Sequence, residues 1–130
     1  MAPNRERTGS EREYLQKIRA LEERLKKEPI PGNYIALAKA YHKIRLFDHV
    51  IKILNKALAR YPSNVDAQYW LGRSYFDKGM VQVAQEILEG VIASIPHHLP
   101  SLKILGHIAY KQKNTTKAIM YYRKVLTLDP

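Results

Sequence analysis

The chain has 130 residues, enough for one domain with its own apolar core, and it contains no cysteine. The lack of cysteine excludes disulfides and thiolate chemistry and is consistent with the cytoplasmic location that we expect. Residues 1–9 are polar, lack the apolar centre of a signal peptide and are predicted to form a disordered tail. No uncharged stretch is long enough to cross a bilayer, so we expect no membrane partner.

Positive charge is in excess but unevenly distributed. The formal net charge is +10, from 22 Lys and Arg residues against 12 Asp and Glu residues. Residues 31–64 and 99–130 each hold six basic side chains against one acidic side chain, whereas residues 65–98 between them are net acidic. Such a chain attracts acidic partners, nucleic acid included, but charge alone chooses none of them.

The first predicted element is a helix over residues 10–28. Ser10 followed by Glu13 is typical of a capping box, in which the serine begins a helix. Pro29 ends the helix, whose apolar stripe comprises Tyr14, Ile18, Leu21 and Leu25. We interpret residues 10–29 as a capping helix that packs on the next domain. The alternative is a short coiled-coil seam that dimerises the chain.

An internal repeat follows this helix. Three prolines lie 34 residues apart, at Pro62, Pro96 and Pro130. The segments that contain them align without gaps and divide the domain over 31–130 into repeats 31–64, 65–98 and 99–130. In each repeat the seventh residue is leucine, the eighth is small, and the twentieth, twenty-fourth and twenty-seventh are apolar or aromatic. Three copies in the same register make the repeat pattern specific.

The spacing within a repeat indicates a helical hairpin. Positions 4, 7, 8 and 11 lie on one face of a first helix, and positions 20, 24 and 27 lie on one face of a second. Small residues at positions 8 and 20 let the two helices approach, and the proline ends the second helix. Such hairpins must stack to bury their apolar faces. The predicted helices cover 33–44, 48–60, 65–78, 82–94, 99–112 and 115–127.

These positions resemble the tetratricopeptide-repeat (TPR) family over residues 31–130. The resemblance implies an all-α fold, a right-handed superhelix of three TPR helix-turn-helix pairs preceded by an N-terminal helix. Two positions depart from the family pattern. The aromatic residue usual at position 4 is present only as Tyr34, and the glycine of the inter-helix turn only as Gly79, where the other repeats have Arg45 and Lys113.

In the TPR family the first helix of each pair lines a concave face that holds a partner. Carried onto this chain, the resemblance implies a groove with an aromatic centre and cationic flanks. The groove residues that it implies are Ile35, Lys39, His42, Lys43, Tyr69, Trp70, Arg73, Phe76, Lys103, Ile104, His107, Tyr110 and Lys111, with Asp66 and Asp77 beside them. Large aromatic side chains next to Lys and Arg are typical of binding hot spots.

We expect this groove to bind another protein through an extended or helical peptide with apolar and acidic residues. An apolar residue of the peptide would contact Tyr69 and Trp70, and its carboxylates would contact the lysines and Arg73. This expectation requires Tyr69, Arg73 and Lys103 to face a common hollow. For Trp70 the alternative is packing between adjacent helices, without contact to a partner.

No catalytic or metal-binding pattern is recognisable in the sequence. The chain lacks a nucleophile elbow, a phosphate-binding glycine loop and a zinc-protease motif, so we do not expect an enzyme. His97 and His98 are adjacent, but no third ligand is recognisable nearby, and surface histidines are the simpler interpretation. No cofactor is predicted.

A scaffold or adaptor that binds a peptide is the function that the sequence favours, and two others stay open. Bacterial secretion-type TPR chaperones resemble this layout of an N-terminal helix and three repeats, without a specific motif behind the likeness. Single-stranded nucleic acid would suit a basic, aromatic groove, although the net acidic middle repeat interrupts the basic surface.

The last predicted helix has no further helix to cover its apolar edge. That edge comprises Ile119, Tyr122 and Leu126. We therefore expect either a longer protein or an interface at this end. Self-association through this edge or through the N-terminal helix is a further prediction.

Overall fold

The computed structural model describes residues 5–130, and every regular element in that range is a helix. Residues 1–4, part of the tail predicted to be disordered, lie outside the described residues. The helices are α1 (Arg5–Lys27), α2 (Pro31–Lys43), α3 (Phe47–Arg60), α4 (Val65–Lys78), α5 (Val81–Ser94), α6 (Leu99–Lys111) and α7 (Thr115–Leu128). The six helices predicted for the repeats are confirmed, with ends within two residues of those predicted.

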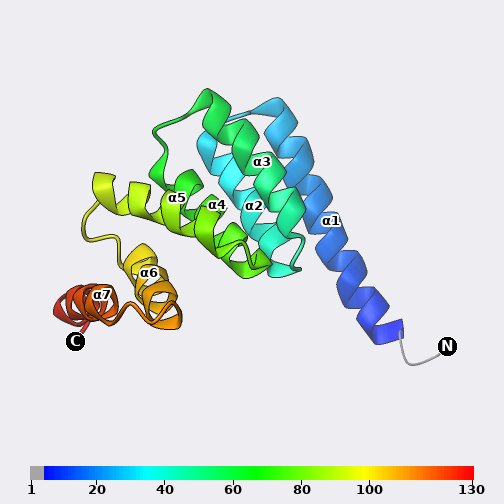
Figure 1. Cartoon of the computed structure of the whole chain (residues 1–130). Coiled ribbons are helices and arrows are strands. Elements are labelled where there is room, and N and C mark those ends of the chain that lie inside the picture. The colour runs from blue at the N-terminus through cyan, green and yellow to red at the C-terminus, as the bar shows by residue number, and fades with distance from the viewer. Residues whose placement is uncertain (1–4) are drawn as a thin grey trace.

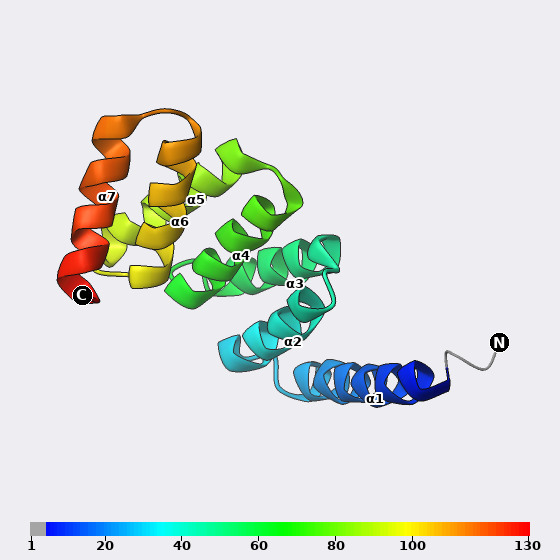
Figure 2. The ribbon, with the colours of Figure 1, turned by 90° about the horizontal axis from the view of Figure 1, so that it is seen from below.

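α1 begins earlier than the capping-box pattern predicted. It starts at Arg5, so Ser10 lies inside the helix and residues 5–9 are helical rather than disordered. Arg and Glu at positions 5–7 favour a helix, and a single glycine at Gly9 costs it only about 1 kcal/mol. Figure 1 and Figure 2 show the N-terminal part of α1 projecting beyond the other helices.

α1 packs its apolar stripe on α2. Ile18 is buried against Leu37 and Ala40, and the hydroxyl of Tyr14 donates a hydrogen bond to the carbonyl oxygen of Ala40 at 2.7 Å. The stripe that the sequence assigned either to a cap or to a dimer seam is therefore occupied within the chain. This contact continues the stacking of the repeats toward the N-terminus.

Two repeats begin with side-chain caps of their first helix. Asn64 accepts a hydrogen bond from the backbone N–H of Ala67 at 2.9 Å and so begins α4. His98 begins α6 in the same way, because its Nδ1 accepts from the N–H of Ser101 at 3.3 Å. His98 is thus half-buried and engaged in a cap, a role that the interpretation of His97 and His98 as surface histidines did not include. Burial lowers the pKa of His98, and the nearby Asp66 carboxylate opposes that shift.

The turns within the three repeats share a left-handed backbone conformation. Gly79 has a φ of 95°, and Arg45 and Lys113 have φ values of 63° and 60°. Residues with a Cβ atom enter this region at a cost of about 1 kcal/mol. Departure from the family glycine at Arg45 and Lys113 therefore leaves the turns in place but strains them.

The two helices of each repeat approach closely because position 8 is small. A methyl group on Gly72 would come within 2.9 Å of Leu88, and one on Gly106 would come within 2.9 Å of Tyr122. Large side chains fill the space around these contacts. Those that are almost completely buried include Leu37, Leu54, Leu88, Leu102, Leu105 and Ile108.

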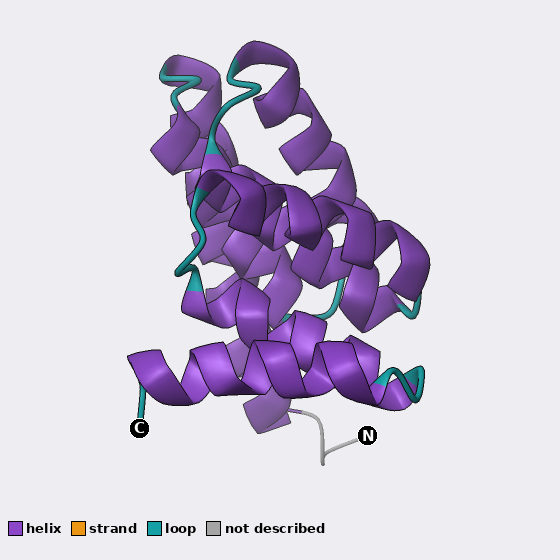
Figure 3. Ribbon diagram, turned by 60° about the vertical axis from the view of Figure 1, so that its left-hand side comes forward, coloured by secondary structure: helices purple, strands orange, loops and turns teal. Residues whose placement is uncertain are grey.

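Stacked hairpins build the molecule. Helices that follow one another in the chain contact each other from α1 to α7, and α2 also contacts α4. Figure 2 shows this succession, with α1 and α7 at opposite ends of the molecule, and Figure 3 shows the short loops that join the helices. α2, α4 and α6 carry the side chains predicted to line the groove.

Candidate functional site

Trp70 fills the space between α2 and α4 on the groove face. It is half-buried and packs against two of the apolar clusters of the core. His42 contacts the ring edge-on, with centroids 5.3 Å apart, and the charges of Lys39 and Arg73 lie 5.6 Å and 4.8 Å from its centroid. Cation–π contacts of this kind contribute about 0.5–1 kcal/mol each. Trp70 is therefore engaged by packing within the chain.

A polar network crosses the same junction. His42 Nε2 lies 2.7 Å from Asp77 Oδ2, and Arg73 Nε lies 3.9 Å from the same oxygen. The Asp77 carboxylate thus faces two basic side chains that come from two different repeats. The His42–Asp77 contact joins the first repeat to the second, and Arg73 offsets the charge of Asp77 within α4.

A hollow of about 340 Å³ opens between α4 and α6. Its lining consists of Tyr69, Arg73, Phe76, Asp77, Pro100, Lys103 and Ile104. Tyr69, Arg73 and Lys103 thus face one hollow, the geometry that peptide binding in the groove requires. Tyr69 is only 8% exposed and forms a wall rather than a free surface, with its hydroxyl 3.5 Å from Arg73 Nη1.

The groove face of α6 is cationic. Lys103 and Lys111 are exposed and lie along one side of the helix, with His107 between them contacting the Phe76 ring edge-on. The sequence of α6 contains no acidic residue. Lys103 Nζ lies 3.8 Å from Asp129 Oδ2, but both side chains are more than half exposed, so the pair contributes little. This side of the hollow can therefore receive carboxylates.

The structure does not bring every predicted groove residue to the hollow. Lys43 turns toward α1, where its ammonium lies 5.8 Å from the centroid of the Tyr14 ring. Tyr110 is 65% exposed and lines a separate hollow of about 780 Å³ at α7, which Lys111 also lines. Ile35 is half-buried against the core. The helical register placed these side chains on α2 and α6 correctly. Their contacts, however, lie with α1, with the apolar core and with α7 rather than at the hollow.

Two residues at this end of the groove were not predicted as groove residues. Pro100 lines the hollow, and it occupies position 2 of its repeat, one of the positions that face the groove in the TPR family. The repeat register could therefore have identified it. Asp129 reaches Lys103 from beyond α7, and no signal in the repeat pattern places it there.

The apolar edge predicted at the last helix is exposed. Ile119, Tyr122 and Leu126 are 46%, 38% and 61% exposed. Their equivalents on α5 include Leu88, which is completely buried because α6 follows it. Self-association through this edge stays a prediction.

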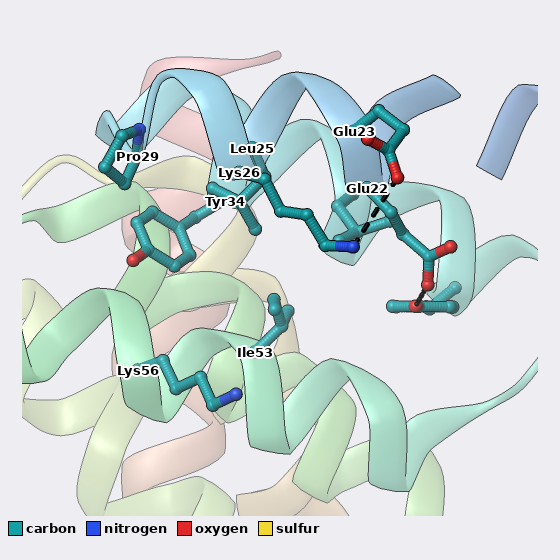
Figure 4. Close-up of a pocket in the computed structure, with 10 residues that line it drawn as sticks. Glu22, Glu23, Leu25, Lys26, Pro29, Tyr34, Ile53 and Lys56 are labelled. Atoms are coloured by element: carbon teal, nitrogen blue, oxygen red, sulfur yellow. Dashed lines mark hydrogen bonds and ion pairs between the residues drawn. The ribbon is translucent and has the colours of Figure 1, made fainter. Parts of the chain in front are cut away.

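A further hollow, of about 510 Å³, lies between α1 and α3 with α2 as its floor (Figure 4). Glu22 Oε2 accepts a hydrogen bond from the Tyr41 hydroxyl at 2.7 Å, and Lys26 Nζ lies 3.5 Å from Glu23 Oε1. Burial, together with the Glu22 carboxylate, raises the pKa of Tyr41 to about 12. Both carboxylates at this hollow therefore have partners within the chain, which leaves less for a ligand to bind than the groove offers.

Neither a metal centre nor a membrane span is found in the part of the chain that the structure describes. No three His, Cys, Asp or Glu side chains gather there in a way that could hold a metal ion. None of its helices is long and apolar enough to cross a bilayer.

Comparison with known proteins identifies the family. A sequence model described as anaphase-promoting complex, cyclosome, subunit 3 matches residues 43–125, more than half of the chain. The chain belongs to this family of TPR proteins. A TPR repeat-containing protein of Methanocaldococcus jannaschii is 29% identical over 107 residues, which make up 82% of this chain and 18% of that protein. The chain thus spans less than a fifth of the length of this relative.

Solved structures agree with the TPR assignment. The crystal structure of MamA is 26% identical, with a TM-score of 0.80, and the match covers 95% of this chain and 73% of that chain. MamA of Desulfovibrio magneticus RS-1 and a tetratricopeptide repeat protein of Parabacteroides merdae are each 18% identical with TM-scores of 0.78, and they show the fold alone. These matches cover 93% and 92% of this chain, and 69% and 48% of those chains. TPR proteins of this kind are typically non-catalytic scaffolds, and the fold supports a role in protein–protein interaction.

Proposed function

We propose that the groove formed by α2, α4 and α6 binds a segment of another protein that carries apolar and acidic side chains. The hollow between α4 and α6 is the observation on which the proposal rests, because Tyr69, Arg73 and Lys103 converge on it. Concave sites with apolar walls and a few oriented charges are the usual form of a binding pocket. The protein would then act as a scaffold or adaptor.

The charges of the face support an acidic partner segment. Lys39 and Lys103 are exposed on α2 and α6, on either side of α4. Asp77 between them faces His42 and Arg73, so it opposes an incoming carboxylate less than a free aspartate would. Rim charges of this kind steer association and help to choose the partner.

The same geometry argues against single-stranded nucleic acid as the partner. Binding of single strands relies on aromatic faces that are free to stack on bases. Trp70 already carries the charges of Lys39 and Arg73 over its ring, and Tyr69 is buried. A peptide needs no such free faces, since an apolar side chain can enter the hollow instead.

Selection from a phage-displayed library of random linear peptides tests the proposal. We expect the wild-type protein to enrich peptides that contain Asp or Glu. The double variant Lys39→Glu, Lys103→Glu should weaken binding of these peptides at least tenfold, because it reverses the charge on both sides of α4. Binding is measured by fluorescence anisotropy of synthetic labelled peptides.

The matched control is Lys52→Glu, Lys117→Glu, which changes net charge equally at exposed positions of α3 and α7. This control should retain the wild-type affinity. Equal losses in the two double variants would show that only net charge matters, and the groove proposal would then be wrong. Failure to enrich any peptide above background would also contradict it.

A further inference from the structure

The hollow between α4 and α6 occupies the place that Trp70 fills one repeat earlier. Trp70 and Ile104 are both the sixth residue of their repeats. Trp70 closes the junction between α2 and α4, whereas the smaller Ile104 lines an open space of about 340 Å³. The two junctions thus differ in the side chain at this repeat position, and α2 also approaches α4 more closely than α4 approaches α6.

The surroundings of the two places correspond residue by residue. Lys39 and His42 contact Trp70 from the first repeat. Arg73 and Phe76, their equivalents 34 residues later, line the hollow. A guanidinium and an aromatic ring therefore border the hollow, the same kinds of group that contact Trp70, although Arg73 also lies over the Trp70 ring and Phe76 contacts His107 edge-on.

The charge next to this hollow has one sign along α6. Lys103 and Lys111 are exposed on one side of that helix, whose sequence holds no carboxylate. The Asp129 side chain near Lys103 is exposed at a distance of 3.8 Å, so a partner carboxylate can displace it at little cost. The hollow and the adjacent face of α6 therefore complement a partner segment in which acidic residues follow an aromatic one.

We propose that the hollow between α4 and α6 binds a large aromatic side chain of the partner segment, with the partner's acidic residues lying along α6. This inference rests on the proposed function and names the anchor that the groove selects. It also moves the apolar contact away from Trp70, which its own repeats already enclose, to the empty equivalent position beside Ile104. An aromatic anchor has few rotatable bonds to immobilise and buries much apolar surface.

Filling the hollow from within the chain tests the proposal. Ile104→Trp should place an indole where the partner's ring would lie. We expect it to reduce the affinity for peptides selected on the wild-type protein at least tenfold, while its melting temperature stays the same or rises. Ile119→Trp is the matched control, because it makes the same substitution at an exposed position of α7. This control should keep the wild-type affinity.

A second measurement needs no variant of the protein. Peptides selected on the wild type should share an aromatic residue near Asp or Glu, and replacement of that residue by alanine should abolish binding. A benzophenone amino acid in its place should cross-link, on irradiation, to the segments of α4 and α6 around Phe76 and Ile104. Cross-links confined to other helices would overturn the inference even if Ile104→Trp failed to fold.

The outcomes separate the two proposals. If peptides bind, lose affinity in Lys39→Glu, Lys103→Glu but tolerate a folded Ile104→Trp, the groove function stands and the aromatic anchor is wrong. Selected peptides without any aromatic residue would likewise overturn the anchor alone. If no peptide is enriched, or if binding ignores both the charge-reversal variant and Ile104→Trp, the groove function itself fails.

Discussion

The junction between α2 and α4 and the junction between α4 and α6 are equivalent in the repeat but differ in how they are filled. The first holds Trp70, clamped by His42 and two cations, whereas the second holds Ile104 and a hollow. A polar contact also crosses the first junction, where His42 Nε2 lies 2.7 Å from Asp77 Oδ2.

This difference shows how a repeat protein can create a site at one of two equivalent junctions. Helix bounds and turns are nearly identical in the three repeats. The two junctions differ in the residue at the sixth repeat position and in helix packing, because α2 approaches α4 more closely than α4 approaches α6. The closed junction fixes the relative placement of the first two repeats. The open junction leaves space that a partner can occupy. Stability and binding are therefore assigned to neighbouring copies of the same structural element.

The largest expected effect tests whether Trp70 is a structural residue. Trp70→Ala should lower the free energy of unfolding by about 3 kcal/mol, because it removes a side chain packed against two core clusters. Ile104→Ala should cost about 1 kcal/mol, since that side chain already borders a hollow. Urea unfolding followed by far-ultraviolet circular dichroism measures both. Equal losses would contradict the distinction between the two junctions.

The next effect tests the contact between Tyr41 of α2 and Glu22 of α1 through the pH dependence of the free energy of unfolding. The pKa of Tyr41 is raised from 10.0 to about 12, so its neutral form is favoured in the folded state. The stabilisation is complete below pH 10 and is lost as pH rises through the folded pKa, by an amount on the order of 2 kcal/mol.

Tyr41→Phe should therefore flatten this part of the stability profile, measured by chemical unfolding between pH 9 and 12. The control Tyr110→Phe alters an exposed tyrosine at the other end of the molecule and should leave the profile as it is. A profile unchanged by Tyr41→Phe would refute the assignment.

A smaller effect compares the interior of the middle repeat with that of the last one. Gly72→Ala should cost about 1.5 kcal/mol, because its methyl group would meet Leu88, which is completely buried and cannot move. Gly106→Ala meets Tyr122 at the same distance, but that ring is 38% exposed and can turn aside. The second change should be neutral or stabilise by up to about 1 kcal/mol, from the helix preference of alanine. Melting temperatures of the two variants measure the difference, and an equal fall in both would mean that the last repeat is packed as tightly as the middle one.

The smallest effect concerns the inter-helix turns of the first and last repeats, which both place a residue with a Cβ atom in the left-handed conformation. Lys113→Gly should stabilise the fold by about 1 kcal/mol, because it relieves a left-handed conformation. Arg45→Gly should gain less, since the Arg45 guanidinium lies 5.1 Å from the centroid of the Phe47 ring and that contact would be lost. Thermal unfolding would show the order of the two gains. A loss of stability in Lys113→Gly would show that the turn carries no strain.

Much of the fold could be predicted because the repeat constrains it three times over. The spacing of Leu37, Leu71 and Leu105 with small neighbours was enough to place six helices and their pairing. The start of α1 was missed, since one local pattern at Ser10 outweighed the helix preference of the residues before it. Local patterns are weaker guides than periodic ones.

The site could be predicted only in part. The register of the family placed Tyr69, Arg73 and Lys103 on one face, and they do line one hollow. The volume of that hollow depends on how α4 and α6 pack, which no periodicity encodes. The clamping of Trp70 and the turning of Lys43 toward α1 are likewise tertiary effects, because they arise from residues far away in the sequence.

The histidine cap of α6 makes one wall of the hollow sensitive to acid. His98 Nδ1 can accept the hydrogen bond of the Ser101 N–H only while that nitrogen carries no proton, and burial lowers the pKa of His98. The cap holds at neutral pH and is lost as pH falls through the lowered value. The first turn of α6, which supplies Pro100, would then fray while the rest of the solenoid keeps its shape. Acidification through that lowered pKa would thus loosen the wall of the hollow that holds a bound ring.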